Sequence, residues 1–294
     1  TQARNTRNLK YWFKNNRVTI FALGVAILLI FFLGLFLQKR FSTKSRAESL
    51  ESSNTIIGGQ DANPADWGFF VQVFSVDKLN GFVLPCGGSL ISPEWILTAA
   101  HCVRYYYQEQ EQNNKSQALY VKLLRTENND KYLFRHVVKT YIPEGYFDNG
   151  IDDIALVNIR SSEKYNDEII YLPRRSLRIP ENTDIRTAGY GISTIAWNAA
   201  EYKNDLSYPG NLKEVELHFQ EFSADKSRII PSEKEIGTCY GDSGGPLVYI
   251  DSLGDNYIVG TTMGGVPGCQ GTRWFANVQN YLNWITEVTG IPTL

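Results

Sequence analysis

Histidine and cysteine are scarce in this chain, which has three histidines and four cysteines among 294 residues. So few histidines leave few side chains that could act as a general base near neutral pH. The four cysteines all follow residue 85, and an even number of them suggests disulfide bonds formed in an oxidising compartment. No internal repeat or low-complexity block occurs. The composition, with 43% hydrophobic and 20% charged residues, is that of a globular protein and excludes a disordered one.

Basic residues are in deficit after residue 55. Residues 1–55 hold nine Lys and Arg against two acids, whereas residues 56–294 hold twenty against twenty-nine. A domain with that acidic excess repels polyphosphate over its general surface. We therefore expect no nucleic acid as a partner.

Charge is absent from residues 18–37, which read VTIFALGVAILLIFFLGLFL. Twenty apolar residues at about 1.5 Å rise cover the roughly 30 Å hydrocarbon core of a bilayer, so we predict a single transmembrane helix. A cleaved signal peptide or a buried core helix are the alternatives. A signal peptide usually has a shorter apolar stretch that ends in small residues, whereas this one ends in Phe and Leu before the basic QKR at 38–40.

The flanks of this span give its expected orientation. Five basic residues precede it and four follow within residues 39–46, so charge alone decides little. The cysteines favour an outside location for everything that follows. We predict a cytoplasmic basic tail over residues 1–17, a polar stalk over 38–55 and an extracellular or periplasmic domain over 56–294.

Short β-branched and aromatic runs, separated by Gly, Pro, Asn and Asp, dominate from residue 56 onward. This pattern predicts an all-β sandwich or barrel. One helix is expected within residues 278–292, because apolar side chains recur there at helical spacing before Gly290 and Pro292. The polar stretch 105–116 is predicted to be an exposed loop, with a possible glycan acceptor at Asn114.

A serine surrounded by glycines, Ser243 in GDSGG, is the first candidate for chemistry. Glycines around a serine can simply form a tight turn, and the pattern also matches the nucleophile elbow of α/β-hydrolases. A serine hydroxyl becomes a good nucleophile only when an imidazole takes its proton. His101, in TAAHC, and Asp153, in DDIALV, could supply the base and the orienting acid, although each alone is as consistent with a packed or solvated residue.

Taken together, TAAHC, DIAL and GDSGGP resemble the chymotrypsin/trypsin family of serine proteases in sequence and in order. The order His101, Asp153, Ser243 rejects the α/β-hydrolase alternative, in which serine comes first. IIGG at 56–59, CGGSLIS at 86–92 and GYG at 189–191 extend the resemblance over the whole of residues 56–294. It implies two antiparallel six-stranded β-barrels with a C-terminal helix.

The resemblance implies a role for each matching residue. His101 is the general base, Asp153 rather than Asp152 orients it, and Ser243 is the nucleophile. The backbone N–H groups of Gly241 and Ser243 form the oxyanion hole. Because His101 must be neutral to act, activity is expected to fall in acid.

Disulfides and activation also follow from the resemblance. It implies that Cys86 pairs with Cys102 and Cys239 with Cys269. Cleavage before Ile56 would create an α-ammonium that pairs with Asp242 and orders the oxyanion loop. Thr55 precedes Ile56 where related zymogens usually carry Arg or Lys, so the activating protease, if there is one, is not expected to be trypsin-like.

Specificity departs from trypsin. Gly237 stands six residues before Ser243, where trypsins place the aspartate that binds Lys or Arg. Arg273 stands where a pocket-lining glycine is usual, as in some granzymes that cleave after aspartate. We expect a preference for acidic residues, with small or aliphatic and bulky apolar residues as alternatives, and Gly264 is expected to pair with extended substrate.

The sequence thus predicts a membrane-anchored serine endopeptidase acting on proteins or peptides, with no metal and no organic cofactor. An alternative from another class is a catalytically silent binding or adhesion module on a protease scaffold.

Overall fold

The chain divides into two units, residues 1–52 and 53–294, and the computed structural model describes residues 56–112, 116–123, 133–160, 168–191 and 211–293. The predicted tail, transmembrane helix and stalk, together with Thr55 and the possible glycan acceptor Asn114, lie outside these residues. Within the described residues, no helix is both long enough and apolar enough to span a membrane.

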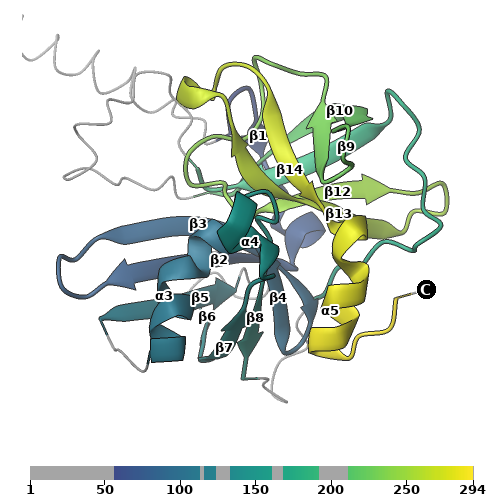
Figure 1. The fold of residues 1–294 in the computed structure, drawn as a ribbon. Helices are drawn as coiled ribbons and strands as arrows, with labels where there is room; N and C mark the ends of the chain where they lie inside the picture. Colours follow the sequence, from purple (N-terminus) through teal and green to yellow (C-terminus); the bar gives the residue numbers. More distant parts are fainter. Residues whose placement is uncertain (1–55, 113–115, 124–132, 161–167, 192–210, 294) are drawn as a thin grey trace, which may run out of the picture. The chain divides into compact units, whose positions relative to one another are not determined.

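The first barrel is built from one antiparallel sheet, shown in blue and teal in Figure 1. Its strand order is β6-β5-β2-β3-β4-β8-β7. Only His136 separates β6 from β7, so these two short strands form one interrupted strand. Its first part pairs with β5 and its second part pairs with β8, which connects the two ends of the sheet. The strands are β2 (Phe70–Asp77), β3 (Val83–Ser92), β4 (Trp95–Thr98), β5 (Gln117–Leu123), β6 (Leu133–Arg135), β7 (Val137–Tyr141) and β8 (Ala155–Ile159).

The second barrel, shown in green and yellow in Figure 1, is a closed ring of six strands, because β10 pairs with both β9 and β11. The two-residue strand β1 adds a seventh at the edge by pairing with β10. The strands are β1 (Gln60–Asp61), β9 (Asp184–Gly189), β10 (Lys213–Phe222), β11 (Arg228–Pro231), β12 (Pro246–Ile250), β13 (Asn256–Gly265) and β14 (Arg273–Asn277).

Two barrels are therefore confirmed, and each has the predicted six strands when β6 and β7 are counted as one interrupted strand and β1 as an addition at the edge; each sheet then has seven named strands. The extra strand has a different local cause in each barrel. In the first, a break at His136 divides one long strand; in the second, the chain just after Ile56 adds β1 to the edge of β10.

Alternation of side chains along the strands forms two buried clusters, one inside the second barrel and one that fills the first barrel and extends to strands of the second. Along β5, Leu119, Val121 and Leu123 are buried, while Tyr120 between them is exposed. Along β10, Val215, Leu217 and Phe219 alternate in the same way and pack with Ile185, Ile229 and Phe275 in the second core.

The predicted C-terminal helix is present as a 3-10 turn, η4 (Val278–Tyr281), that continues into α5 (Leu282–Thr289). The Asn277 side chain accepts the Gln279 N–H and caps the start, and Gly290 ends the helix in the left-handed conformation. The remaining helices are α3 (Ala100–Gln112), α4 (Gly145–Asn149), η1 (Pro64–Trp67) and η3 (Pro267–Cys269).

Helix α3 corrects the prediction of an exposed loop over residues 105–116, since its last two turns occupy residues 105–112. Val103 is buried, and Tyr106 and Tyr107 pack against the core at spacings of three and four residues. This helical spacing was present in the sequence, but the Gln- and Glu-rich stretch that follows obscured it.

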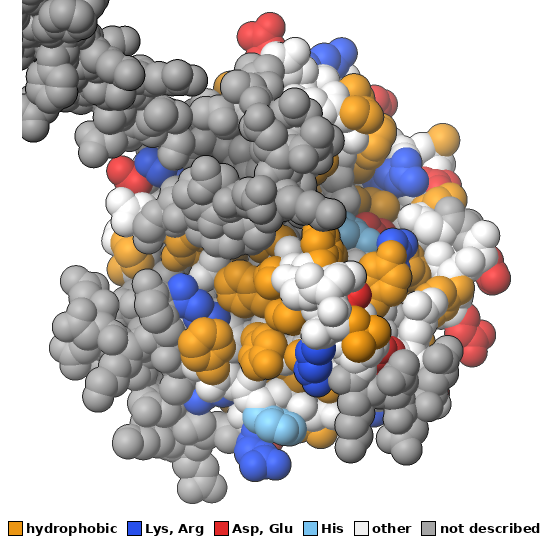
Figure 2. Space-filling model, turned by 90° about the vertical axis from the view of Figure 1, so that its left-hand side faces the viewer, with side chains coloured by type: hydrophobic (Ala, Val, Ile, Leu, Met, Phe, Trp, Pro, Cys, Tyr) orange, Lys and Arg blue, Asp and Glu red, His pale blue; other side chains and the backbone are white. Residues whose placement is uncertain are grey.

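Figure 2 shows one face on which hydrophobic side chains gather near the centre, while lysine, arginine, aspartate and glutamate side chains are interspersed around them.

Candidate active site

His101 and Asp153 meet at the end of the first barrel. His101 lies in the first turn of α3, directly after β4, and Asp153 lies two residues before β8, which pairs with β4. The imidazole Nδ1–H donates to Asp153 Oδ2 at 2.7 Å, since a carboxylate can only accept. The His101 backbone N–H donates to Oδ1 at 2.9 Å. Asp153, which is 6% exposed, therefore fixes both the ring and the backbone that carries it.

Asp152, the alternative acid, forms a hydrogen bond with Tyr281 and not with His101. Its Oδ1 accepts the phenolic O–H of Tyr281 at 2.7 Å. Tyr281 is 8% exposed, and burial is the first cause that raises its pKa, so the phenol remains a donor. The C-terminal helix thus holds the loop that carries Asp153.

Ser243 lies on a loop of the second barrel, four residues after the Cys239 disulfide, and this loop contacts the first barrel. The Ser243 carbonyl accepts the Gly87 N–H of β3 at 2.7 Å. The sulfur of Cys102 lies 3.7 Å from the Ser243 carbonyl oxygen and 3.7 Å from His101 Nε2. The serine backbone and the free imidazole nitrogen therefore face the same sulfur atom.

Within the part of the chain that the structure describes, the backbone around Ser243 leaves two N–H groups without a partner. The N–H groups of Asp242, Gly244 and Gly245 donate to carbonyls at 3.1, 2.7 and 2.9 Å. In contrast, those of Gly241 and Ser243 have no acceptor among the described residues. Two free amides beside a serine hydroxyl are the arrangement that binds a developing oxyanion.

Gly244 allows the two barrels to approach. Its φ is +76°, and a Cβ at this position would lie 2.2 Å from Thr98 Oγ1 and 2.6 Å from the Gly87 carbonyl oxygen. Any side chain would therefore separate the serine loop from β3 and β4.

Both predicted disulfides are present. Cys86–Cys102 joins β3 to α3 and borders His101, and Cys239–Cys269 joins the serine loop to the segment before β14. The ligand atoms of Cys86, His101 and Cys102 lie within 4.8 Å of one another. Because the two sulfurs are bonded to each other, they offer no thiolate to a metal ion.

Asp242 is almost completely buried, at 1% exposure, and joins two loops. Its Oδ1 accepts the Gly191 N–H at 2.7 Å and its Oδ2 accepts the Cys239 N–H at 2.8 Å. Burial raises the pKa of Asp242 to about 7, although these two bonds and the charge of Arg273 oppose the shift.

Ile56 is fully buried in the core of the second barrel. The next residue, Ile57, forms an antiparallel bridge with Gly237, with N–H···O distances of 3.0 and 2.8 Å. The predicted activation segment is therefore packed beside the loop that leads to Ser243.

Arg273, at the start of β14, is buried rather than pointing to solvent, with 2% exposure. Its guanidinium donates to four backbone carbonyls, those of Thr238 at 3.0 Å, Lys234 at 3.1 Å, Gly271 at 3.0 Å and Cys269 at 2.7 Å. Of its five N–H donors, one on Nη2 has no acceptor among the described residues.

Gly237 leaves the space that Arg273 fills. A Cβ at Gly237 would lie 2.7 Å from Arg273 Cδ and 2.8 Å from Nε, and the φ of Gly237 is +127°. The two residues singled out in the sequence are thus in direct contact, which no sequence pattern indicated.

A cavity of about 60 Å³ remains in front of Arg273. Gly264 at the end of β13, the Cys239–Cys269 disulfide and Arg273 all line it, whereas Gly237 lies behind the guanidinium. The pairing of β13 with β14 shifts register between Thr262 and Gly264, at Met263. Of the predicted pocket residues, Arg273 and Gly264 therefore line one small cavity, whereas Gly237 contacts Arg273 and does not line it.

Sequence reasoning missed two contributors. The Thr238 carbonyl accepts Nε of Arg273, and backbone acceptors leave no signal in side-chain identity. Tyr281 was recognised only as an apolar member of the C-terminal helix, and nothing in the sequence connects it to Asp152, 129 residues away.

Comparison with known proteins places this geometry in a family. The family model described as Trypsin matches residues 56–285. Over 83% of the chain, the sequence is 28% identical to human "Transmembrane protease serine 11B" and 26% identical to "Trypsin 5G1" of Aedes aegypti. The matched region covers 58% of the human protein and 88% of the mosquito protein. The chain spans about three fifths of the length of the human relative. Because the family model matches residues 56–285, which are most of the chain, this chain belongs to the trypsin family of serine endopeptidases.

Proposed function

We propose that residues 56–294 hydrolyse peptide bonds through an acyl-enzyme formed on Ser243. The observation that carries this proposal is the double hydrogen bond from His101 to Asp153, set beside a serine flanked by two free N–H groups. A protein or peptide substrate follows from the family.

The residues divide the chemistry among them. His101 Nε2 takes the hydroxyl proton of Ser243 as the oxygen attacks the scissile carbonyl, and later returns it to the leaving amine. Asp153 holds the Nδ1–H tautomer and stabilises the imidazolium that forms. The N–H groups of Gly241 and Ser243 donate to the oxyanion, a contribution of about 3 kcal/mol for each donor in related chemistry.

A phosphonofluoridate probe tests the nucleophile, because it labels only an activated serine. We expect stoichiometric labelling of Ser243 in chain processed at Ile56, and none in Ser243→Ala. Absence of labelling in chain whose new terminus has been sequenced would favour the binding or adhesion module instead.

We propose that the small cavity selects aspartate before the scissile bond. The support is the buried positive charge of Arg273 with one N–H to spare, and the small volume in front of it. Four of the five guanidinium donors of Arg273 are already engaged, so one charge-assisted hydrogen bond to the substrate carboxylate is the geometry available.

A positional peptide library tests this specificity. We expect cleavage after Asp above Glu, and loss of this preference in Arg273→Gly while Ser243 remains reactive towards phosphonofluoridate. Cleavage after Lys or Leu with none after Asp would reject the acidic preference. Cleavage confined to Ala and Ser would show that volume, not charge, selects the residue.

We further propose that the protein is anchored in a membrane through residues 18–37, with the protease domain outside. We also propose that cleavage before Ile56 creates an α-ammonium that pairs with the buried carboxylate of Asp242. The uncharged twenty-residue run and the name of the human relative support the anchor. Two measurements test the span and its orientation. The full chain should resist extraction from membranes at high pH, and its N-terminal tail should be protected from added protease in sealed, right-side-out vesicles.

A further inference from the structure

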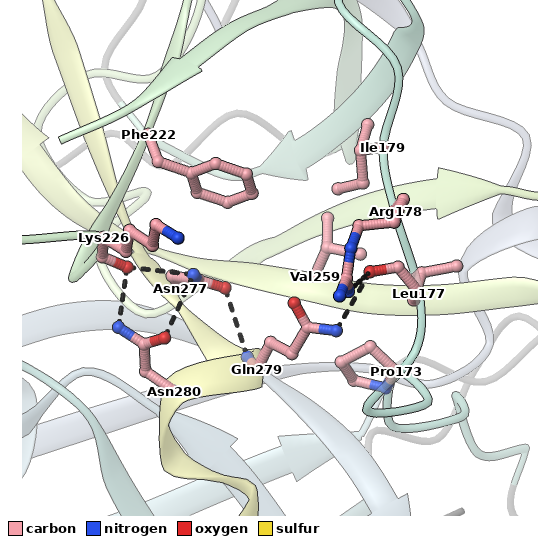
Figure 3. Close-up of a pocket in the computed structure, with 10 residues that line it drawn as sticks. All are labelled: Pro173, Leu177, Arg178, Ile179, Phe222, Lys226, Val259, Asn277, Gln279 and Asn280. Atoms are coloured by element: carbon pink, nitrogen blue, oxygen red, sulfur yellow. Dashed lines mark hydrogen bonds between the residues drawn. The ribbon is translucent and has the colours of Figure 1, made fainter. Parts of the chain in front are cut away.

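A second cavity, of about 300 Å³, lies on the second barrel among residues that take no part in the candidate active site (Figure 3). Its walls are formed by the segment before β9, the turn between β10 and β11, and the junction of β14 with η4. One wall is apolar, with Val259 buried and Ile179 and Phe222 half-buried. The size suits one large side chain together with its backbone groups.

Lys226 stands at one side of the cavity on a turn that is held rigidly. It adopts the left-handed conformation, with φ of 57°, which costs a residue with a side chain about 1 kcal/mol. Its carbonyl accepts the side-chain amides of Asn277 at 2.9 Å and Asn280 at 2.6 Å, and these bonds fix the turn (Figure 3). Its exposed ammonium forms no ion pair with any described residue.

Arg178 stands on the opposite side (Figure 3). Its Nη1 donates to the Leu177 carbonyl at 2.9 Å, which holds the guanidinium at the rim. No Asp or Glu is among the described residues that line the cavity. Two cations without a facing carboxylate give this cavity a positive potential that attracts an anionic group.

Gln279 forms the floor, and its orientation is fixed. Its Nε2 lies within hydrogen-bond distance of the carbonyls of Arg174, Arg175 and Leu177, at 2.9, 3.0 and 3.1 Å. The Oε1 atom is therefore turned to the other side, into the cavity (Figure 3), where no described residue donates to it. A ligand that satisfies this atom must carry a hydrogen-bond donor.

We propose that this cavity binds the carboxyl terminus of a peptide whose last side chain is apolar. The terminal carboxylate lies between Lys226 and Arg178, the last side chain packs on Phe222 and Ile179, and the last N–H donates to Gln279 Oε1. A simple aromatic or aliphatic acid shares the first two features but lacks the donor. This assignment goes beyond the proposed peptidase activity and does not depend on Ser243.

Fluorescence anisotropy with the full chain carrying Ser243→Ala tests this site without hydrolysis. The probe is fluorescein-labelled Gly-Gly-Gly-Ala-Phe with a free carboxylate. We expect about tenfold weaker binding of the same peptide with a C-terminal amide, and a similar loss in Lys226→Gln or in Arg178→Gln. Lys139→Gln, which removes an exposed lysine from β7 of the other barrel, is the matched control and should bind as the parent does.

The amide comparison needs no variant, so the proposal stays testable if a substitution prevents folding. Equal binding of the acid and the amide would overturn it. If 3-phenylpropanoate displaces the probe as effectively as the unlabelled peptide does, the peptide assignment is overturned and the cavity is a site for small acids. Loss of binding in Arg273→Gly but not in Lys226→Gln would place the peptide in the candidate active site instead.

Discussion

Gly237 and Arg273 constrain each other, so neither residue can be understood alone. The glycine is not merely the absence of an aspartate, because a Cβ there would overlap the arginine at 2.7 Å. The arginine in turn cross-links the pocket through four carbonyls, contributed by residues on both sides of the Cys239–Cys269 disulfide. The proposed specificity and the local stability of the pocket therefore rest on the same pair.

Gly237→Ala is expected to lower the free energy of unfolding by about 2 kcal/mol, from overlap and from strain at φ +127°. A double-mutant cycle with Arg273→Gly, followed by urea unfolding, separates the two causes. Once the guanidinium is gone, the alanine should cost at least 1 kcal/mol less. Strictly additive effects would contradict a direct clash. Gly254→Ala, at φ +85° with no atom within 4 Å of the added Cβ, controls for strain alone.

Asp242 should make the unprocessed chain sensitive to pH. Burial raises the pKa of its carboxyl to about 7, above the value of about 3.9 in an unfolded chain, so the folded state binds the proton more tightly. The stabilisation is complete below about pH 4 and is lost as pH rises through 7, at up to about 1.4 kcal/mol per pH unit.

Asp242→Asn should remove that slope. Urea unfolding of chain uncut at Ile56, at pH 4.5, 6 and 7.5, measures it against the parent. After cutting, an α-ammonium at Ile56 would favour the carboxylate, and the parent should lose its slope as well. A parent and a variant with parallel pH profiles before cutting would refute this role for burial.

At the scale of elements, the connection between η4 and the loop before β8 links the C-terminal helix to the candidate catalytic acid. Tyr281→Phe removes only the O–H bonded to Asp152 at 2.7 Å. We expect kcat to fall several-fold with KM nearly unchanged, because the change loosens Asp153 without touching the pocket, and the acid limb of the pH–rate profile should shift. Tyr171→Phe, at an exposed tyrosine, is the control. A loss of stability with unchanged kcat would reduce Tyr281 to a packing residue.

The sequence predicted most strands and the C-terminal helix because their alternation or helical spacing reports directly which side chains are buried. It missed the part of helix α3 that follows His101. The glutamines and glutamates there show no helical spacing of apolar side chains, and only Val103, Tyr106 and Tyr107 mark the buried side of the helix. It also missed the break at His136 and the strand β1, which depend on pairing partners far away in the chain. In the site, side-chain identities were accessible, whereas the carbonyls that hold Arg273 were not, because every residue has one.

For the whole molecule, the contact between the barrels at Gly244 should decide whether a reactive serine forms at all. A Cβ at Gly244 would lie 2.2 Å from Thr98 Oγ1, 2.6 Å from the Gly87 carbonyl oxygen and 2.9 Å from the Ala99 nitrogen. Most of these atoms belong to backbone and cannot move aside, so Gly244→Ala must displace the serine loop from the first barrel. Displacement of a nucleophile by about 1 Å costs on the order of 100-fold in rate.

We therefore expect phosphonofluoridate labelling of Ser243 to slow by about 100-fold in Gly244→Ala. The free energy of unfolding should fall by about 2 kcal/mol, which is a typical cost of overpacking a core. Gly81→Ala, at a similar φ of +72° but with no atom within 4 Å, should cost only backbone strain and leave labelling unchanged. Separate unfolding transitions of the two barrels in Gly244→Ala would show that this contact also couples their folding. Normal labelling in Gly244→Ala would mean that the serine loop can react without its contact to β3, and the two-barrel assembly of the site would then have to be abandoned.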